Sequence, residues 1–111
     1  MTQEEKRAAI AEAMGYKRHP PSRENILPDP FTCPNDLQAV EDFILDRWDL
    51  SVSLQDDFVD AEIWKRKAPM KVSLMGSTRI RHDGSKADRF RAKADAVVTA
   101  VLEALKGAEH E

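Results

Sequence analysis

The segment SKADRFRAKADAVVTAVLEALKG, residues 85–107, decides the fold of this chain. Apolar side chains recur in it at intervals of three and four residues, which is the period of an α-helix. They are Ala87, Phe90, Ala94, Val97, Val98, Val101 and Leu105. Ser85, followed three residues later by Asp88, is typical of a helix start, and Gly107 is typical of a helix end. We therefore predict a long amphipathic helix that ends at Gly107, followed by a frayed tail over residues 108–111.

Three runs of alternating apolar and polar residues precede this helix, over residues 50–54, 59–63 and 70–74. Such alternation predicts strands with one buried face. A turn at residues 55–57 joins the first two runs into a hairpin, and Gly76 ends the third. Residues 78–82 are expected to add a short edge strand. The predicted core has two sides, the helix residues Phe90, Val97, Val101 and Leu105, and the strand residues Leu50, Val52, Leu54, Val72 and Leu74.

Two shorter helices are predicted nearer the N-terminus. Thr2 and Glu5 have the spacing of a capping box, and Gly15 fits the left-handed position that ends a helix. The second helix is expected to begin at Asn35 or Asp36, both good capping residues. Its apolar stripe runs to Trp48, which we place in the core.

Residues 17–34 contain five of the six prolines in the chain. Proline removes backbone donors and favours extended geometry in the residue before it, so this segment predicts an ordered, extended strap. Phe31 is expected to pin the strap to the domain. Cys33, the only cysteine, lies just before a helix start, where thiols can be activated. Since no histidine is near it in sequence, we interpret Cys33 as a small structural anchor.

The length of 111 residues predicts one domain, residues 1–111. Its fold class is α+β: three helices with a small, sandwich-like sheet of three to four mainly antiparallel strands. No apolar run approaches the ~20 residues that span a bilayer, and no signal-peptide pattern is present. We expect a soluble, cytoplasmic protein without membrane contact.

The motifs that support catalysis are missing from the sequence. Metal sites need convergent ligands at set spacing, and the acidic turn at Asp56, Asp57 and Asp60 lacks the pattern of a calcium loop. Gly76 and Gly84 are isolated, so no phosphate-binding loop is predicted. We expect no cofactor, no metal and no catalytic residue, and we classify the chain as non-enzymatic.

Charge is unevenly distributed along the chain. Residues 41–62 carry eight carboxylates against Arg47 alone, whereas residues 79–93 are basic. A helix start in a basic segment attracts anions, so this segment is a candidate site for a nucleotide or a nucleic-acid backbone. Its candidate residues are Arg79, Arg81, His82, Ser85, Lys86 and Arg89. The alternative is an ordinary capped helix whose basic residues pair with the acidic segment.

Two aromatic residues are candidates for binding a protein partner. Trp64 falls on the polar side of its strand, and Phe58 lies on the same strand. Exposed aromatic side chains often dominate protein interfaces. The alternative for Trp64 is packing beneath the proline strap, and the sequence does not separate the two.

Several short motifs, in order, resemble the phage ABA-sandwich domain family. They are AEAMGYK at residues 11–17, the proline loop, DLQAVE at residues 36–41, three strands and an alanine-rich final helix. Tyr16 stands where tryptophan is commoner in that family. The resemblance implies an α+β sandwich and an accessory protein of a phage or prophage, working in the host cytoplasm. It implies no catalytic residue. We expect a protein partner from host or phage, and inhibition of a host defence is one form of that role.

Overall fold

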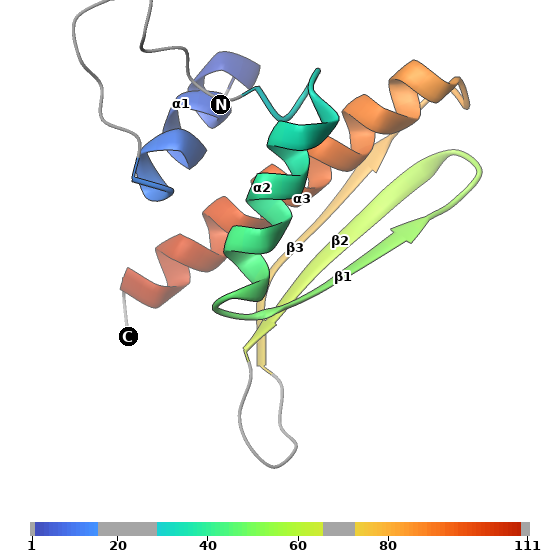
Figure 1. Cartoon of the computed structure of the whole chain (residues 1–111). Helices are drawn as coiled ribbons and strands as arrows, with labels where there is room; N and C mark the ends of the chain where they lie inside the picture. The colour runs from blue at the N-terminus through green and yellow to red at the C-terminus, as the bar shows by residue number, and fades with distance from the viewer. Residues whose placement is uncertain (1, 16–28, 66–72, 110–111) are drawn as a thin grey trace, which may run out of the picture.

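The computed structural model describes residues 2–15, 29–65 and 73–109 (Figure 1). The elements are α1 (Gln3–Ala13), α2 (Pro34–Leu45), β1 (Asp49–Leu54), β2 (Phe58–Lys65), β3 (Ser73–Arg81) and α3 (Lys86–Glu109). The predicted α+β class, with three helices and a small antiparallel sheet, is confirmed. The predictions for the strap over residues 17–28, for residues 70–72 and for the tail at 110–111 lie outside the described residues.

The sheet has the strand order β1-β2-β3, and both pairings are antiparallel. The register pairs Val59 with Leu54 on one side and with Ile80 on the other. It is interrupted by one irregularity between Ile63 and Trp64. β3 runs without a break through Gly76, so the predicted strand end at Gly76 and the separate strand at 78–82 are wrong. The glycine instead marks the place where a helix backbone approaches the strand.

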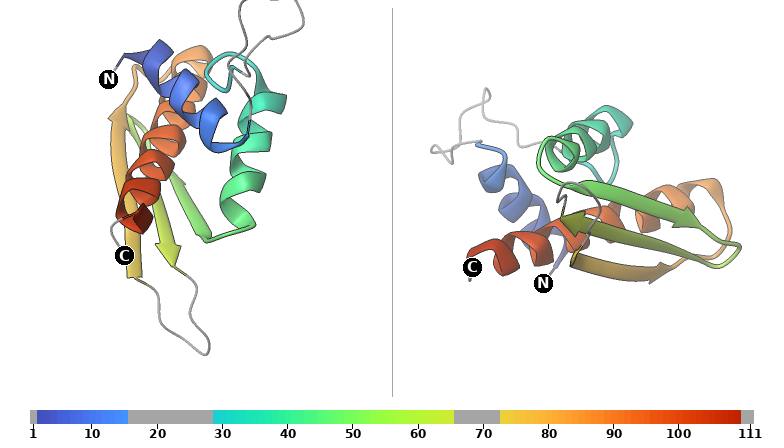
Figure 2. Two further views of the ribbon diagram at one scale, coloured as in Figure 1. Left: turned by 90° about the vertical axis from the view of Figure 1, so that its left-hand side faces the viewer. Right: turned by 90° about the horizontal axis from the view of Figure 1, so that it is seen from below.

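The helices form a layer on one face of this sheet, and no described element covers the other face (Figures 1 and 2). α3 packs over β2 and β3, whereas α2 packs against β1 and α3. α1 lies on α3, where Ile10 and Ala11 are buried. Two ion pairs tie the helices together, from Lys6 to Asp95 at 2.7 Å and from Lys93 to Glu41 at 3.3 Å.

The core differs from the predicted one in its strand residues. Val97, Val101 and Trp48 are buried as predicted, but Leu54 and Leu74 are 60% and 51% exposed, so their placement in the core is wrong. Phe90, Leu105, Leu50 and Val52 are half-buried at its border, and Ala87 is exposed. The strand side of the core comes instead from the central strand, through Val59, Ala61 and Ile63. A central strand is covered by neighbours on both sides, whereas β1 is an edge strand. The irregular register turns Leu74 to the open face.

α3 buries small residues as well as the predicted valines. Ala92, Ala96, Ala100 and Ala104 recur every four residues, and all are fully buried. Side chains at this spacing share one face of a helix. A face of alanines allows a close approach between a helix and its neighbours.

The ends of the helices show which capping predictions hold. The Glu5 backbone N–H donates to Thr2 Oγ1 at 3.2 Å, and Gly15 has a φ of 95°, both as predicted. α2 begins at Pro34 with Cys33 in the capping position, not at Asn35 or Asp36. The Asp36 carboxylate instead accepts the backbone N–H of Asp29 at 2.8 Å and so fixes the turn before the helix. α3 continues past Gly107 to Glu109, so its predicted end is wrong.

Candidate functional site

The candidate site is the face of the sheet that the helices leave open. Side chains alternate between the two faces of a strand, and opposed residues in the register share a face. Since Val59, Ala61 and Ile63 face α3, the residues between them face outward. The open face is formed by Asp49, Ser51, Ser53, Phe58, Asp60, Glu62, Trp64, Leu74, Ser77, Arg79 and Arg81.

A cluster of Phe58, Asp60 and Arg79 occupies one end of this face. The Arg79 guanidinium stacks over the Phe58 ring at 4.2 Å from its centroid. It also contacts both oxygens of Asp60, with Nε–Oδ1 at 2.8 Å and Nη2–Oδ2 at 3.3 Å. This hydrogen bond and the charge of Asp60 raise the pKa of Arg79 above its ordinary value. Phe58, a predicted binding residue, is therefore half-buried under its own arginine.

At the other end of the open face, no described cation stacks on the aromatic ring. Trp64 is half-buried and is paired in the register with Leu74, which is 51% exposed. Glu62 lies two positions before Trp64 on the same face and forms no ion pair with any residue in the described ranges. We call Glu62, Trp64 and Leu74 the Trp64 patch. Phe58 and Trp64 lie at opposite ends of β2, about 20 Å apart at ~3.3 Å per residue.

His82, predicted as an anion ligand, is buried in the connection between β3 and α3. The Gly84 N–H donates to His82 Nδ1 at 3.0 Å, so this nitrogen carries no proton. The other ring nitrogen, Nε2, therefore carries the proton and donates to the Gln55 carbonyl at 3.0 Å. The His82 backbone N–H donates to the Asp57 carbonyl at 3.0 Å. His82 thus joins the turn between β1 and β2 to the start of α3.

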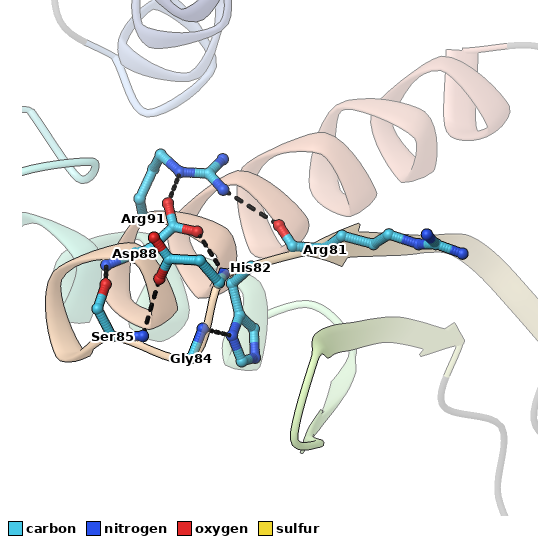
Figure 3. A network of polar contacts seen from close by, with 7 residues as sticks. Arg81, His82, Gly84, Ser85, Asp88 and Arg91 are labelled. Atoms are coloured by element: carbon cyan, nitrogen blue, oxygen red, sulfur yellow. Dashed lines mark hydrogen bonds and ion pairs between the residues drawn. The ribbon is translucent and has the colours of Figure 1, made fainter.

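Ser85 caps α3 as predicted, within a network of carboxylates (Figure 3). Its hydroxyl accepts the Asp88 N–H at 3.2 Å, while its own N–H donates to Asp83 Oδ1 at 2.8 Å. The Asp83 N–H donates to Asp88 Oδ2 at 2.8 Å. Arg91 Nε contacts Asp88 Oδ1 at 2.6 Å, and Arg91 Nη2 donates to the Arg81 carbonyl at 3.1 Å. Two carboxylates of the chain itself, Asp83 and Asp88, therefore lie at the start of α3.

The network lowers the pKa of both carboxyl groups. Hydrogen bonds from the Ser85 side chain and backbone lower the pKa of Asp83. The hydrogen bond from Arg91, and then the backbone N–H of Asp83, lower the pKa of Asp88. Both groups are therefore ionised at neutral pH, and their charge opposes an anion at the same place.

The three remaining basic candidates are surface residues. Arg81, Lys86 and Arg89 have exposed side chains, and within the described part of the chain none of them forms an ion pair. The Arg81 side chain points away from the capping network (Figure 3). The structure thus separates the six predicted anion residues into a paired arginine, a buried histidine, a capping serine and three exposed cations. Two basic side chains, Arg79 and Lys93, pair with Asp60 and Glu41 of the acidic segment.

Cys33 has a half-buried free thiol at the start of α2. Its backbone N–H donates to the Asp29 carbonyl at 2.9 Å, and the nearby Phe31 is 4% exposed. Phe31 thus anchors the chain as predicted, although residues 30–32 form a turn and not an extended strap. Asp56 and Asp57 are exposed, and in the described segments no group of His, Cys, Asp and Glu side chains could hold a metal ion.

Among the helices that the structure describes, none has the length and apolar character needed to cross a membrane. Comparisons of the chain with protein-family models, with curated proteins and with solved structures found no match. The resemblance to the phage ABA-sandwich family stays a prediction.

Proposed function

We propose that this chain is a non-enzymatic binding protein whose open sheet face contacts a protein partner. The resemblance to the phage ABA-sandwich family extends this proposal to a phage accessory protein that binds a host or phage protein, with inhibition of a host defence as one form of that role. The Trp64 patch is the observation that carries the proposal.

The Trp64 patch has the composition of an interface centre. A large aromatic side chain lies beside an exposed leucine, on a face that no described element covers. Tryptophan contributes large contact area with little loss of conformational entropy, and it is enriched among residues that dominate binding energy. The Phe58 cluster at the other end of the face is already closed by Arg79, which makes it the weaker candidate.

The patch also restricts the chemistry of its partner. Glu62 adds a carboxylate without an ion pair among the described residues, directly beside the apolar pair. The complementary surface is an apolar side chain next to a lysine or arginine. Such a partner would bury the exposed part of Leu74 and neutralise Glu62 at the same time.

The test uses two exposed leucines on different faces of the sheet. Leu74→Lys changes the Trp64 patch, whereas Leu54→Lys changes the helix side of β1, where the leucine is somewhat more exposed than Leu74. A tagged wild-type chain captures candidate partners from a host lysate, and each candidate is then purified and titrated. The proposal is supported by a partner that binds the wild type and Leu54→Lys with similar affinity and binds Leu74→Lys at least tenfold more weakly. Equal binding by Leu74→Lys and the wild type would reject the Trp64 patch as the contact.

A further inference from the structure

The two edges of the sheet are protected differently. At the β3 edge, the Ser77 N–H donates to Glu103 Oε2 at 3.3 Å, and the Arg81 carbonyl accepts from Arg91 Nη2 at 3.1 Å. Both side chains come from α3. Charged side chains along a strand edge are a common protection against pairing with another chain. The β3 edge is therefore partly closed by the protein itself.

At the β1 edge, no described side chain forms a comparable hydrogen bond to the strand between Leu50 and Leu54. The Gln55 N–H donates to the Phe58 carbonyl at 2.9 Å. Along an antiparallel strand pair, hydrogen-bonded residue pairs alternate with pairs that are not hydrogen-bonded. Ser53 and Ser51 consequently bond to β2, while the backbone N–H and C=O groups of Leu50, Val52 and Leu54 point away from it. No residue in the described ranges bonds to these outward groups. The stretch from Leu50 to Leu54 also carries no charge.

We propose that β1 pairs with β1 of a second copy of this chain, antiparallel and about a two-fold axis through Val52. The two three-stranded sheets would then form one continuous sheet. Each Val52 would exchange hydrogen bonds with its counterpart, and Leu50 would do so with Leu54 of the second copy. This inference does not rest on the proposed function, because it uses the edge of the sheet and not its open face.

The sequence of β1 favours this register over its neighbours. With Val52 on the axis, Leu50 faces Leu54, Ser51 faces Ser53, and Asp49 faces Gln55, so no like charges meet. A shift by two residues in one direction opposes Asp49 to Asp57, and a shift in the other direction opposes Leu54 to Trp48, outside the strand. Only even shifts keep the apolar residues on one face. The register on Val52 also covers Leu54, the most exposed large apolar side chain among the described residues.

Self-complementarity is the reason for choosing a second copy as the occupant. The same six-residue strand, Asp49–Leu54, supplies matching donors, acceptors and side chains on both sides of the axis. A pairing of this length buries less surface than a standard stable interface, so we expect a reversible dimer with a dissociation constant of roughly micromolar order or weaker.

The test measures self-association of the full chain by sedimentation over a range from micromolar to millimolar concentration. In the proposed register Ser51 of each copy faces Ser53 of the other. Ser51→Lys combined with Ser53→Lys therefore places two pairs of opposed lysines in the interface. Ser51→Lys combined with Ser53→Glu opposes unlike charges at the same positions. Both serines are exposed, and they lie opposite Glu62 and Asp60 within one chain, so the fold should accept the two lysines. A glutamate at position 53 would oppose Asp60, whose charge is paired with Arg79, so circular dichroism must first show that this variant is folded. A third variant, Val52→Pro, removes the outward donor on the axis.

We expect the wild type to dimerise, the double lysine variant to dimerise about tenfold more weakly, and the lysine–glutamate variant to recover wild-type association or exceed it. Val52→Pro, where circular dichroism shows it folded, should be monomeric. A wild type that stays monomeric at about millimolar concentration would overturn the proposal. So would a dimer that the double lysine variant forms as tightly as the wild type, since its interface would then lie elsewhere.

Discussion

The backbone of Gly76 in β3 lies directly against the carbonyl group of Ala100 in α3. A Cβ atom at position 76 would overlap the Ala100 carbonyl oxygen. It would also lie 3.1 Å from the Ala100 carbonyl carbon and 3.2 Å from the Ala104 backbone nitrogen. These backbone atoms belong to the interior of a 24-residue helix and cannot rotate away as a side chain would. The absence of a side chain at Gly76 therefore sets how closely α3 approaches the sheet.

Gly76→Ala should lower the free energy of unfolding by about 3 kcal/mol, because α3 must shift away from β3 to admit the methyl group. Urea denaturation followed by circular dichroism measures the change. Gly107→Ala is the matched control. Its Cβ would meet only the Met75 methyl group, at 4.0 Å, and alanine favours a helix over glycine by up to about 1 kcal/mol. The control should be neutral or more stable, and a similar loss in both variants would contradict the close-packing argument.

The contrast between α3 and Gly76 shows what the sequence can predict. The helical spacing of Val97 and Val101 and the alternation in β2 are local patterns, so the elements and the fold class followed from them. A glycine in a strand indicates either an end or a close approach. The choice at Gly76 depends on Ala100, which is distant in sequence.

The candidate site was predictable to a similar degree. The alternation along β2 placed Trp64 on the polar face without any contact information. The irregular register at Trp64 has no signature in the nearby sequence, so simple alternation predicts Leu74 in the core. His82 is close in sequence to several arginines, and sequence proximity alone predicts that it acts with them. Its actual partner, the carbonyl of Gln55, belongs to a different turn.

His82→Phe should destabilise the fold, since it leaves the Gln55 carbonyl and the Gly84 N–H without their partner. An unsatisfied buried polar group costs about 1–3 kcal/mol, so we expect a loss of about 2 kcal/mol or more in urea denaturation. His82→Asn should lose less, because its amide oxygen can still accept the Gly84 N–H. The ¹⁵N shifts of the wild-type ring should show the proton on Nε2. Wild-type stability in His82→Phe would exclude this linking role.

Acid should weaken the start of α3 through Asp83 and Asp88. The folded state lowers the pKa of both groups, so their contribution to stability is complete above the unfolded value of about 3.9. It is lost as the pH falls through the lower, folded values, because the unfolded state then binds more protons. Urea denaturation between pH 7 and pH 2 should show this acid limb. The double variant Asp83→Asn with Asp88→Asn should have a lower free energy of unfolding at pH 7, and this free energy should change less with pH below pH 4. An acid-induced loss of stability equal to that of the wild type would contradict the role of the two carboxylates.

The anion-binding alternative is tested at the three exposed cations Arg81, Lys86 and Arg89. Reversing all three to glutamate removes the positive charge near the start of α3 without breaking an ion pair among the described residues. Arg79 is left unchanged, because reversing it would oppose Asp60 to a like charge. If a protein partner binds the Trp64 patch, the triple variant should bind it with an affinity within about twofold of the wild type at ~0.15 M salt, where surface charges are screened beyond about 8 Å.

A fluorescent single-stranded oligonucleotide is the probe for the alternative, since phosphate contacts weaken steeply with salt. We expect only weak binding of this probe at low salt. Tight oligonucleotide binding at ~0.15 M salt that the triple variant loses, while Leu74→Lys retains it, would replace the protein-binding proposal with a nucleic-acid one.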